Sequence, residues 1–341
     1  MIHHRDRIGI ELDEQPKPRG VIKRCNRDFI VREITTKGAL PLLGHTTLSG
    51  SYDKDAFVLF NMTKQGITSN DTVFEVARQL HARVKDVTMH GMKDRWAITP
   101  QLIAIRSDVL SKERRFNHHS IYMRDIGTAS QPLRIGGNKG NHFWIRVRRC
   151  YTWPDLADVH AVPIFFGGQR FGRLGDEQHV GRLLLTGNAE EAGYRITFPP
   201  LRWRLEQALS ECNGNHRQAF LHPMMQEVSK FSVSQWQSYL FNRLVSAHIR
   251  SGLHLPGTFP LWCNRHSALY QSVWESAEPI EKEFERMAAR TQRRTMVSPR
   301  NFTFRNERDQ SVVFEFELPS GSYATVVLGQ LYTLVEKEHG G

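Results

Sequence analysis

The sequence of 341 residues predicts an α+β protein, with strands near both ends of the chain and helices in its middle. Three observations support this prediction. Short apolar runs and alternating apolar residues indicate strands between residues 29 and 149, helical spacing dominates from 177 to 292, and alternation returns near residue 312. Hydrophobic residues make up 40% of the chain, which is therefore long and apolar enough for one large core or two ordinary ones.

The first part of the chain reads mainly as strands. Residues 1–19 are expected to form a flexible leader that contains prolines. A helix is expected from Asp71, because Thr72 and Glu75 have the spacing of a capping box and apolar residues follow at helical spacing. Strands are expected at Phe29–Ile34, Ala56–Phe60, Val87–His90, Leu102–Ile105 and Phe143–Arg149.

The middle of the chain reads as helical, and its end as strand followed by helix. Helices are expected at Glu177–Leu185, Trp203–Cys212, Ser234–Ser251 and Ile280–Gln292, with Gly252 as a helix C-cap. Alternation from Val312 to Leu318 predicts a strand, and residues 324–335 predict a last helix. This order suggests a mainly helical insertion at 190–297, within a domain formed by 20–189 and 298–341.

Composition narrows the class of function. Lysine and arginine number 46 against 35 acidic residues, giving a net charge of +11, as expected of a protein that binds nucleic acid. No apolar run approaches the roughly 20 residues of a membrane span. The four cysteines form no CxxC pair and no secretory signal is recognisable, so a cytoplasmic location is expected. The 16 histidines show no HxxxH or HExxH pattern, and neither a metal site nor a cofactor is expected.

Two segments carry the chemistry. In the first, Gly91–Gln101, a single carboxylate, Asp94, stands between the cations Lys93 and Arg95 in a loop between two expected strands. A carboxylate beside basic groups stays ionised and can act as a nucleophile or base. The second, Phe165–Gly172, combines three phenylalanines, three glycines and an arginine. An aromatic ring on such a loop can stack on a base extruded from its helix.

Both segments resemble the signature motifs of the TruD family of pseudouridine synthases, GxKD(K/R)xAxTxQ and NYFGxQRFG. Further blocks match in the order of that family, from about Gly20 to Leu331. They are Gly20–Lys23, Asp28–Glu33, Lys139–Phe143, Tyr239–Asn242 and Leu318–Thr325.

The resemblance implies a pseudouridine-synthase-type catalytic domain on a mostly antiparallel sheet, with an inserted, mainly helical α/β TRUD domain. It also implies that the chain isomerises a uridine of tRNA, uridine 13 in the family, without a cofactor or metal. Asp94 would be catalytic. Substrate-binding residues would be Lys23, Phe29, Phe166, Gln169 and Arg170, and RNA-binding residues Lys93, Arg95, Arg293 and Arg294. RNA, specifically tRNA, is the expected partner, with no membrane and no obligate protein partner.

Among the departures from the family pattern, which include Phe165, Trp96 and Gly329, the most serious is at residue 164. The family usually has Asn two residues before the phenylalanine that matches Phe166. This chain has Ile164 there, whose side chain offers neither a hydrogen-bond donor nor an acceptor. Two alternatives to the synthase therefore stay open. One is an RNA-binding or RNA-folding protein on the same scaffold with weak or lost catalysis. The other is a carboxylate-dependent glycosidase, which would need a second positioned acid that the sequence does not identify.

Overall fold

The computed structural model describes residues 7–12, 17–49, 57–110, 116–150, 159, 161–172, 177–274 and 279–336. Its contacts divide the chain into two units, each made of two segments. Met1–Gln15 and Val162–Val297 form the helical unit, and Pro16–Ala161 and Ser298–Gly341 form the sheet unit. The division before Val162 lies earlier than residue 190, where the sequence suggested that an insertion begins. The α+β class is confirmed.

The sheet unit is built on one sheet of 11 strands among its described residues. The strands are β1 (Arg19–Ile22), β2 (Phe29–Thr35), β3 (Gly38–Ala39), β4 (Phe57–Gln65), β5 (Val87–Met89), β6 (Ile98–Arg106), β7 (Ile121–Ala129), β8 (Gly140–Arg148), β13 (Arg300–Glu307), β14 (Ser311–Pro319) and β15 (Thr333–Glu336). The main order is β13-β14-β8-β2-β6-β4-β7. Only β1–β15 and β2–β6 pair in parallel among these strands, so the sheet is mostly antiparallel, as expected.

Alternation in β8 follows the predicted pattern. Phe143, Ile145 and Val147 are buried, and the residues between them are partly exposed. In the register with β14, Phe316 lies opposite Phe143, and the two rings stack with centroids 5.5 Å apart. Such cross-strand aromatic pairs stabilise an antiparallel sheet beyond their buried area. The match between the two halves of the sheet unit therefore depends on strands that are far apart in sequence.

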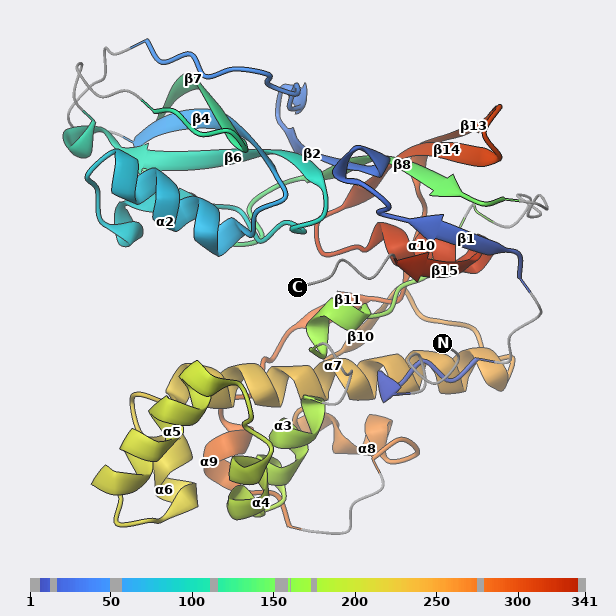
Figure 1. The fold of residues 1–341 in the computed structure, drawn as a ribbon. Helices are drawn as coiled ribbons and strands as arrows, with labels where there is room; N and C mark the ends of the chain where they lie inside the picture. Colours follow the sequence, from blue (N-terminus) through green and yellow to red (C-terminus); the bar gives the residue numbers. More distant parts are fainter. Residues whose placement is uncertain are drawn as a thin grey trace. The chain divides into compact units, whose positions relative to one another are not determined.

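Helix α2 (Ser69–Gln79) covers one part of this sheet (Figure 1). Val76 and Ala77 of α2 are buried in a core cluster with residues of β4, β5, β6 and β7. The predicted capping box at Thr72 is wrong. The helix begins earlier, because the side chain of Thr68 caps it by accepting the N–H of Asp71. The position of α2 matters for the site, since its first residue contacts the loop that carries Asp94.

The helical unit is built around one long helix, α7 (Gln226–Arg250; Figure 1), and 13 of the 25 residues of this helix are buried. Its other elements are α3 (Gln178–Leu185), α4 (Ala189–Tyr194), α5 (Pro199–Glu211), α6 (His216–Leu221), α8 (Ser267–Tyr270), α9 (Lys282–Glu285) and the paired strands β9 (Val162–Pro163) with β12 (Met296–Val297) and β10 (Thr258–Pro260) with β11 (Gln292–Arg294). Gly252, at φ +65°, ends α7 as expected: its N–H and that of Leu253 bond Ile249 and His248.

The N-terminal stretch is not a free leader where the structure describes it. Ile8 and Ile10 are buried, and the backbone N–H of Glu11 donates to Ser246 of α7. Residues 1–6 and 13–16, the rest of the expected leader before Lys17, lie outside the described residues. Burial of the two isoleucines and hydrogen bonds with α7 attach this stretch to the helical unit. Nothing in the sequence indicated this contact, because α7 lies more than 200 positions away.

Two predicted helices are wrong in extent. The range 280–292 contains only α9, and β11 already starts at Gln292. The side-chain amide of Gln237 bonds both the N–H and the C=O of Ala289, which withdraws these groups from a helix. Helix α10 (Ala324–Leu331) stops before residue 335, because β15 pairs with β1 instead. Tertiary pairing overrode the local helical spacing in both places.

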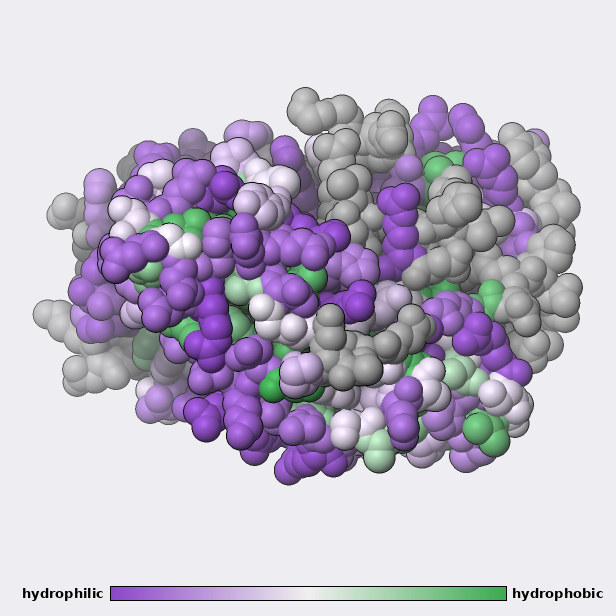
Figure 2. Space-filling view, turned by 90° about the horizontal axis from the view of Figure 1, so that it is seen from below, coloured by the Kyte–Doolittle hydropathy of each residue, from purple (hydrophilic) through white to green (hydrophobic). Residues whose placement is uncertain are grey.

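Figure 2 shows one face of the molecule, where hydrophilic residues predominate and hydrophobic ones form small, separate patches. No helix within the described ranges is long and apolar enough to span a membrane. The same residues contain no group of three or more His, Cys, Asp or Glu placed to hold a metal ion. All four cysteines are free thiols.

Candidate active site

Asp94 lies in the loop that joins β5 to β6, as the sequence predicted. Its carboxylate receives two hydrogen bonds: Lys23 Nζ lies 2.5 Å from Oδ2, and the backbone N–H of Trp96 lies 3.1 Å from Oδ1. The side chain remains 17% exposed. The fold thus brings Lys23 and Asp94, 71 residues apart in sequence, into one ion pair that is still accessible at its carboxylate end.

Lys23 follows β1 with a left-handed backbone, φ 54°, which is uncommon for a residue with a side chain. Its ammonium also lies 2.8 Å from Glu336 of β15 and 4.9 Å from the centre of the Phe29 ring. Burial acts to lower the pKa of Lys23, but attraction and hydrogen bonds from Asp94 and Glu336 outweigh it and raise that pKa. Lys23 therefore stays a cation beside the carboxylate, with Phe29 beneath it.

A second lysine, Lys64 of β4, holds the backbone of the same loop. Its ammonium lies 2.8 Å from the carbonyl oxygen of Asp94, 2.9 Å from that of Ile67 and 3.4 Å from that of Lys93. Burial lowers the pKa of Lys64 to about 8, against the attraction of Asp94. Ser69, the first residue of α2, adds a hydrogen bond of 2.8 Å from the N–H of Lys93. Sequence reasoning missed Lys64, since nothing marks a lysine within a strand as buried.

The two cations beside Asp94 in sequence point to different surroundings. Lys93 has a side chain only 9% exposed, with its ammonium 3.8 Å from Glu33, which also bonds His90 at 2.7 Å. Burial lowers the pKa of Lys93, and Glu33 opposes that shift. Arg95 is exposed and its guanidinium lies over the Trp96 ring at 4.7 Å. Of these two predicted RNA contacts, Arg95 is the one whose charge faces solvent.

The phenylalanine–glycine loop belongs to the helical unit. Phe166 is fixed through its backbone by the buried Asn242 of α7: its N–H donates to Oδ1 at 2.7 Å, and its carbonyl accepts from Nδ2 at 3.0 Å. The ring is half-buried, with the guanidinium of Arg293 3.7 Å above it and Phe241 edge-on at 5.6 Å. The side-chain amide of Asn242 thus fixes the backbone of Phe166, while the phenylalanine ring stays partly exposed.

The remaining predicted residues of this unit differ in their surroundings. Arg170 bonds the hydroxyls of Ser234 and Ser238 at 2.6 and 3.2 Å, so its guanidinium is anchored to α7. Arg294, next to Arg293 on β11, is exposed, and Ile164 is buried at 4% exposure. The side chain of Gln169 lies outside the part of the chain that the structure describes.

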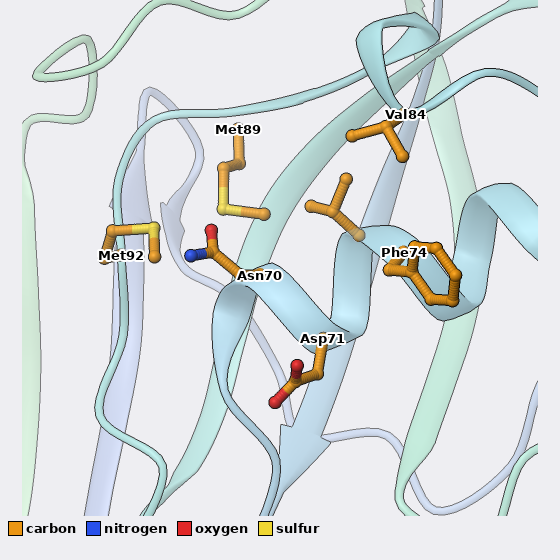
Figure 3. Close-up of a pocket in the computed structure, with 7 residues that line it drawn as sticks. Asn70, Asp71, Phe74, Val84, Met89 and Met92 are labelled. Atoms are coloured by element: carbon orange, nitrogen blue, oxygen red, sulfur yellow. The ribbon is translucent and has the colours of Figure 1, made fainter. Parts of the chain in front are cut away.

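An open apolar cavity of about 420 Å³ borders the Asp94 loop (Figure 3). Met92 of the loop and Met89 of β5 line it on one side, and Asn70, Asp71 and Phe74 of α2 on the other; Val73 and Val84 complete the lining. Phe74 and Met92 are each 61% exposed. Its volume lies within the range of ligand sites, roughly 300–1,000 Å³, and most of the exposed surface of its walls is apolar.

Known proteins are similar to this chain along most of its length. The family model described as tRNA pseudouridine synthase D (TruD) matches residues 9–202. Proteins of Pyrococcus abyssi and Methanocaldococcus jannaschii, both named as probable tRNA pseudouridine synthase D, are each 25% identical; the alignments cover 94% and 91% of this chain and 98% and 94% of theirs. A crystal structure from Methanosarcina mazei, also named for this synthase, has a TM-score of 0.68 at 22% identity, covering 96% of this chain and 97% of that one. At that identity the structural match shows the fold alone.

Proposed function

Because this chain belongs to the tRNA pseudouridine synthase D (TruD) family, we propose that it isomerises a uridine of tRNA to pseudouridine, uridine 13 by resemblance, with Asp94 as the catalytic carboxylate. The observation that carries the proposal is the ion pair between Asp94 and the buried Lys23, on a loop that also matches the family motif. The net charge of +11 suits a polyanionic substrate.

The reaction breaks the N1–C1′ bond of uridine, turns the uracil and joins C5 to C1′, after which C5 loses its proton and N1 gains one. Atoms and electrons balance without an added group, so the residues need only to bind, orient and move a proton. Asp94 supplies a carboxylate that acts as nucleophile or base. Lys23 keeps that carboxylate ionised and oriented, and Phe29 supports the lysine from below. Phe166 supplies a ring for stacking on a base of the RNA.

The test is release of tritium from C5-labelled uridine in an unmodified tRNA transcript. Asp94→Asn is expected to lower the single-turnover rate at least about a hundredfold, because the carboxylate takes part in bond changes and proton transfer. RNA affinity should stay within a few fold, since one carboxylate adds little to the binding of a polyanion. Asp108→Asn is the matched control, because Asp108 is an exposed aspartate whose carboxylate is paired with a cation, Arg106. An Asp94→Asn variant that retains more than a hundredth of the rate would refute the assignment.

A second candidate function is motivated by Ile164. This candidate is an RNA-binding protein with weak or lost catalysis. Its affinity for tRNA would fall as the salt concentration rises, but it would release little or no tritium from any transcript. Mapping pseudouridine in the RNA after incubation, by carbodiimide modification and primer extension, separates the two candidates. It also shows whether the modified position is uridine 13.

A further inference from the structure

Lys64 is the fully buried lysine beneath the Asp94 loop, at 0% exposure. A lysine ammonium carries three N–H donors and no acceptor. Three backbone carbonyl oxygens lie within 3.4 Å of it, those of Ile67, Lys93 and Asp94. The number of donors equals the number of acceptors, and two of these acceptors belong to consecutive residues of the loop that carries the proposed catalytic carboxylate.

We propose that Lys64 is a positioning residue for the isomerisation: it holds the backbone at Asp94 so that the carboxylate keeps its place beside Lys23. This inference rests on the proposed function of Asp94. The aspartate is held at two points, its carboxylate by Lys23 and its main-chain carbonyl by Lys64. A small displacement of the carboxylate from its productive geometry is costly to the rate, which gives the second anchor its importance.

The burial of Lys64 argues against a role in packing alone. A charged group taken out of water destabilises the folded state unless its partners compensate, and an apolar side chain of similar length commonly serves stability better. The lowered pKa of Lys64 shows that compensation is incomplete. A lysine at this place in β4 is therefore expected to lower the free energy of unfolding relative to an apolar side chain, and its hydrogen bonds to the loop account for its presence.

The protonation state of Lys64 gives a distinctive signature. Two charged groups face it, Asp94, which raises its pKa, and Lys93, which lowers it. Its cross-strand neighbours in β6 and β7, Thr99 and Ile121, carry no charge. Above a pH of about 8 the amine keeps two donors and turns a lone pair toward carbonyl oxygens. The hold on the loop weakens, and the rate should fall as pH rises.

Stability should move in the opposite direction. The folded pKa of about 8 lies below the unfolded value of 10.5, so between these two values the unfolded chain binds more protons. The contribution of Lys64 to the free energy of unfolding therefore increases as pH rises through this window. A residue with a purely structural role would not make the rate fall while the fold becomes more stable.

The experiment compares wild type, Lys64→Met and Lys64→Arg, with the exposed Lys85→Met as control. Single-turnover tritium release from tRNA is measured from pH 6.5 to 9.5. Lys64→Met should be about 10- to 100-fold slower at pH 7, as expected from losing hydrogen bonds to a charged donor, with RNA affinity unchanged. The wild-type rate should fall above a pH of about 8, and this fall should be absent in Lys64→Met. Lys64→Arg, charged throughout, should restore part of the rate and also lack the fall.

Hydrogen–deuterium exchange over residues 90–97 provides a readout that does not depend on activity. Exchange should be faster in Lys64→Met than in wild type or Lys85→Met. The proposal is overturned if a folded Lys64→Met variant turns over like wild type, if it keeps the alkaline fall, or if its loop exchanges no faster. A wild-type protein that releases no tritium from any tRNA refutes the proposed function instead, and the exchange measurement still tests the anchor.

Discussion

Replacing Asn242 tests how the Phe166 loop is held. The side chain of Asn242 is fully buried in α7 and makes three hydrogen bonds: it accepts the N–H of Phe166 and donates to the carbonyls of Phe166 and Ile8. It thus joins the loop, the long helix and the N-terminal stretch. Asn242→Ala removes all three bonds and leaves their backbone partners buried.

The expected magnitude follows from this count. A hydrogen bond within a protein contributes about 0.5–1.5 kcal/mol, so three give a loss of roughly 1.5–4.5 kcal/mol in the free energy of unfolding. Asn242→Asp has the same shape and keeps the acceptor for Phe166, but its carboxylate faces two carbonyl oxygens. Burial there should raise its folded pKa above the unfolded value of about 3.9. Its stability should then fall as pH rises above about 4, because the folded state binds the extra proton.

Urea unfolding followed by tryptophan fluorescence measures both variants. Three indole rings of the helical unit lie close together: Trp236 and Trp274 at 5.4 Å, and Trp262 and Trp274 at 4.8 Å. Their part of the fluorescence reports this unit, whereas Trp96 and Trp144 report the sheet unit. Asn264→Ala, at an exposed position of the same unit, is the control and should change stability by less than about 0.5 kcal/mol. An Asn242→Ala variant as stable as this control would show that the three hydrogen bonds do not hold the loop.

Three other substitutions address RNA binding and rate. Arg294→Glu, at an exposed position of β11, should reduce the slope of log affinity against log salt concentration by roughly 0.7–0.9 per lost phosphate contact. Filter binding from 50 to 300 mM salt measures this slope, and an unchanged slope would exclude a contact between Arg294 and an RNA phosphate. Ile164→Asn, which restores the usual family residue, should raise the single-turnover rate several-fold and lower the free energy of unfolding, because it buries an amide. A level or lower rate in the folded variant would mean that the loop of Phe166 depends on the apolar residue. Phe74 lines the cavity, and if a base of the RNA stacks on its exposed ring, Phe74→Ala should weaken tRNA binding about 5- to 100-fold and change stability by less than about 0.5 kcal/mol. The control is Phe198→Ala, at similar exposure, and equal losses of affinity in the two variants would argue against this stacking.

Much of the fold could be predicted because its strands have local signatures. The alternation in β8 and β14 follows from burial of one face of a sheet, and both strands formed where expected. The segments around Thr333 and Gln292 could not be predicted in the same way. Their helical spacing is real, but β1 and β10 supply backbone partners from distant parts of the sequence, and these contacts decide the outcome.

The site shows the same limit. Motif position predicted the loop of Asp94, and its closeness to Lys23 followed from the family resemblance. The hydrogen bonds of Lys64 and Asn242 could not be predicted, although Asn242 belongs to a block that matches the family, because each side chain bonds the backbone of a residue distant in sequence. The directions of Lys93 and Arg95 were equally hidden: the two cations flank one carboxylate, yet Lys93 turns inward toward the buried carboxylate of Glu33, a residue distant in sequence.

The pairing of β1 with β15 has a consequence for how the protein is made. β1, which ends at Ile22, is translated long before its partner, Thr333–Glu336. The contact of Ile8 with Asn242 likewise waits for α7. At about 5–20 residues per second, both segments stay without their partners while the residues in between are made. A chain that ends before residue 333 would lack both the strand that pairs with β1 and the second carboxylate beside Lys23, so premature termination should yield protein in which the proposed active site is incomplete.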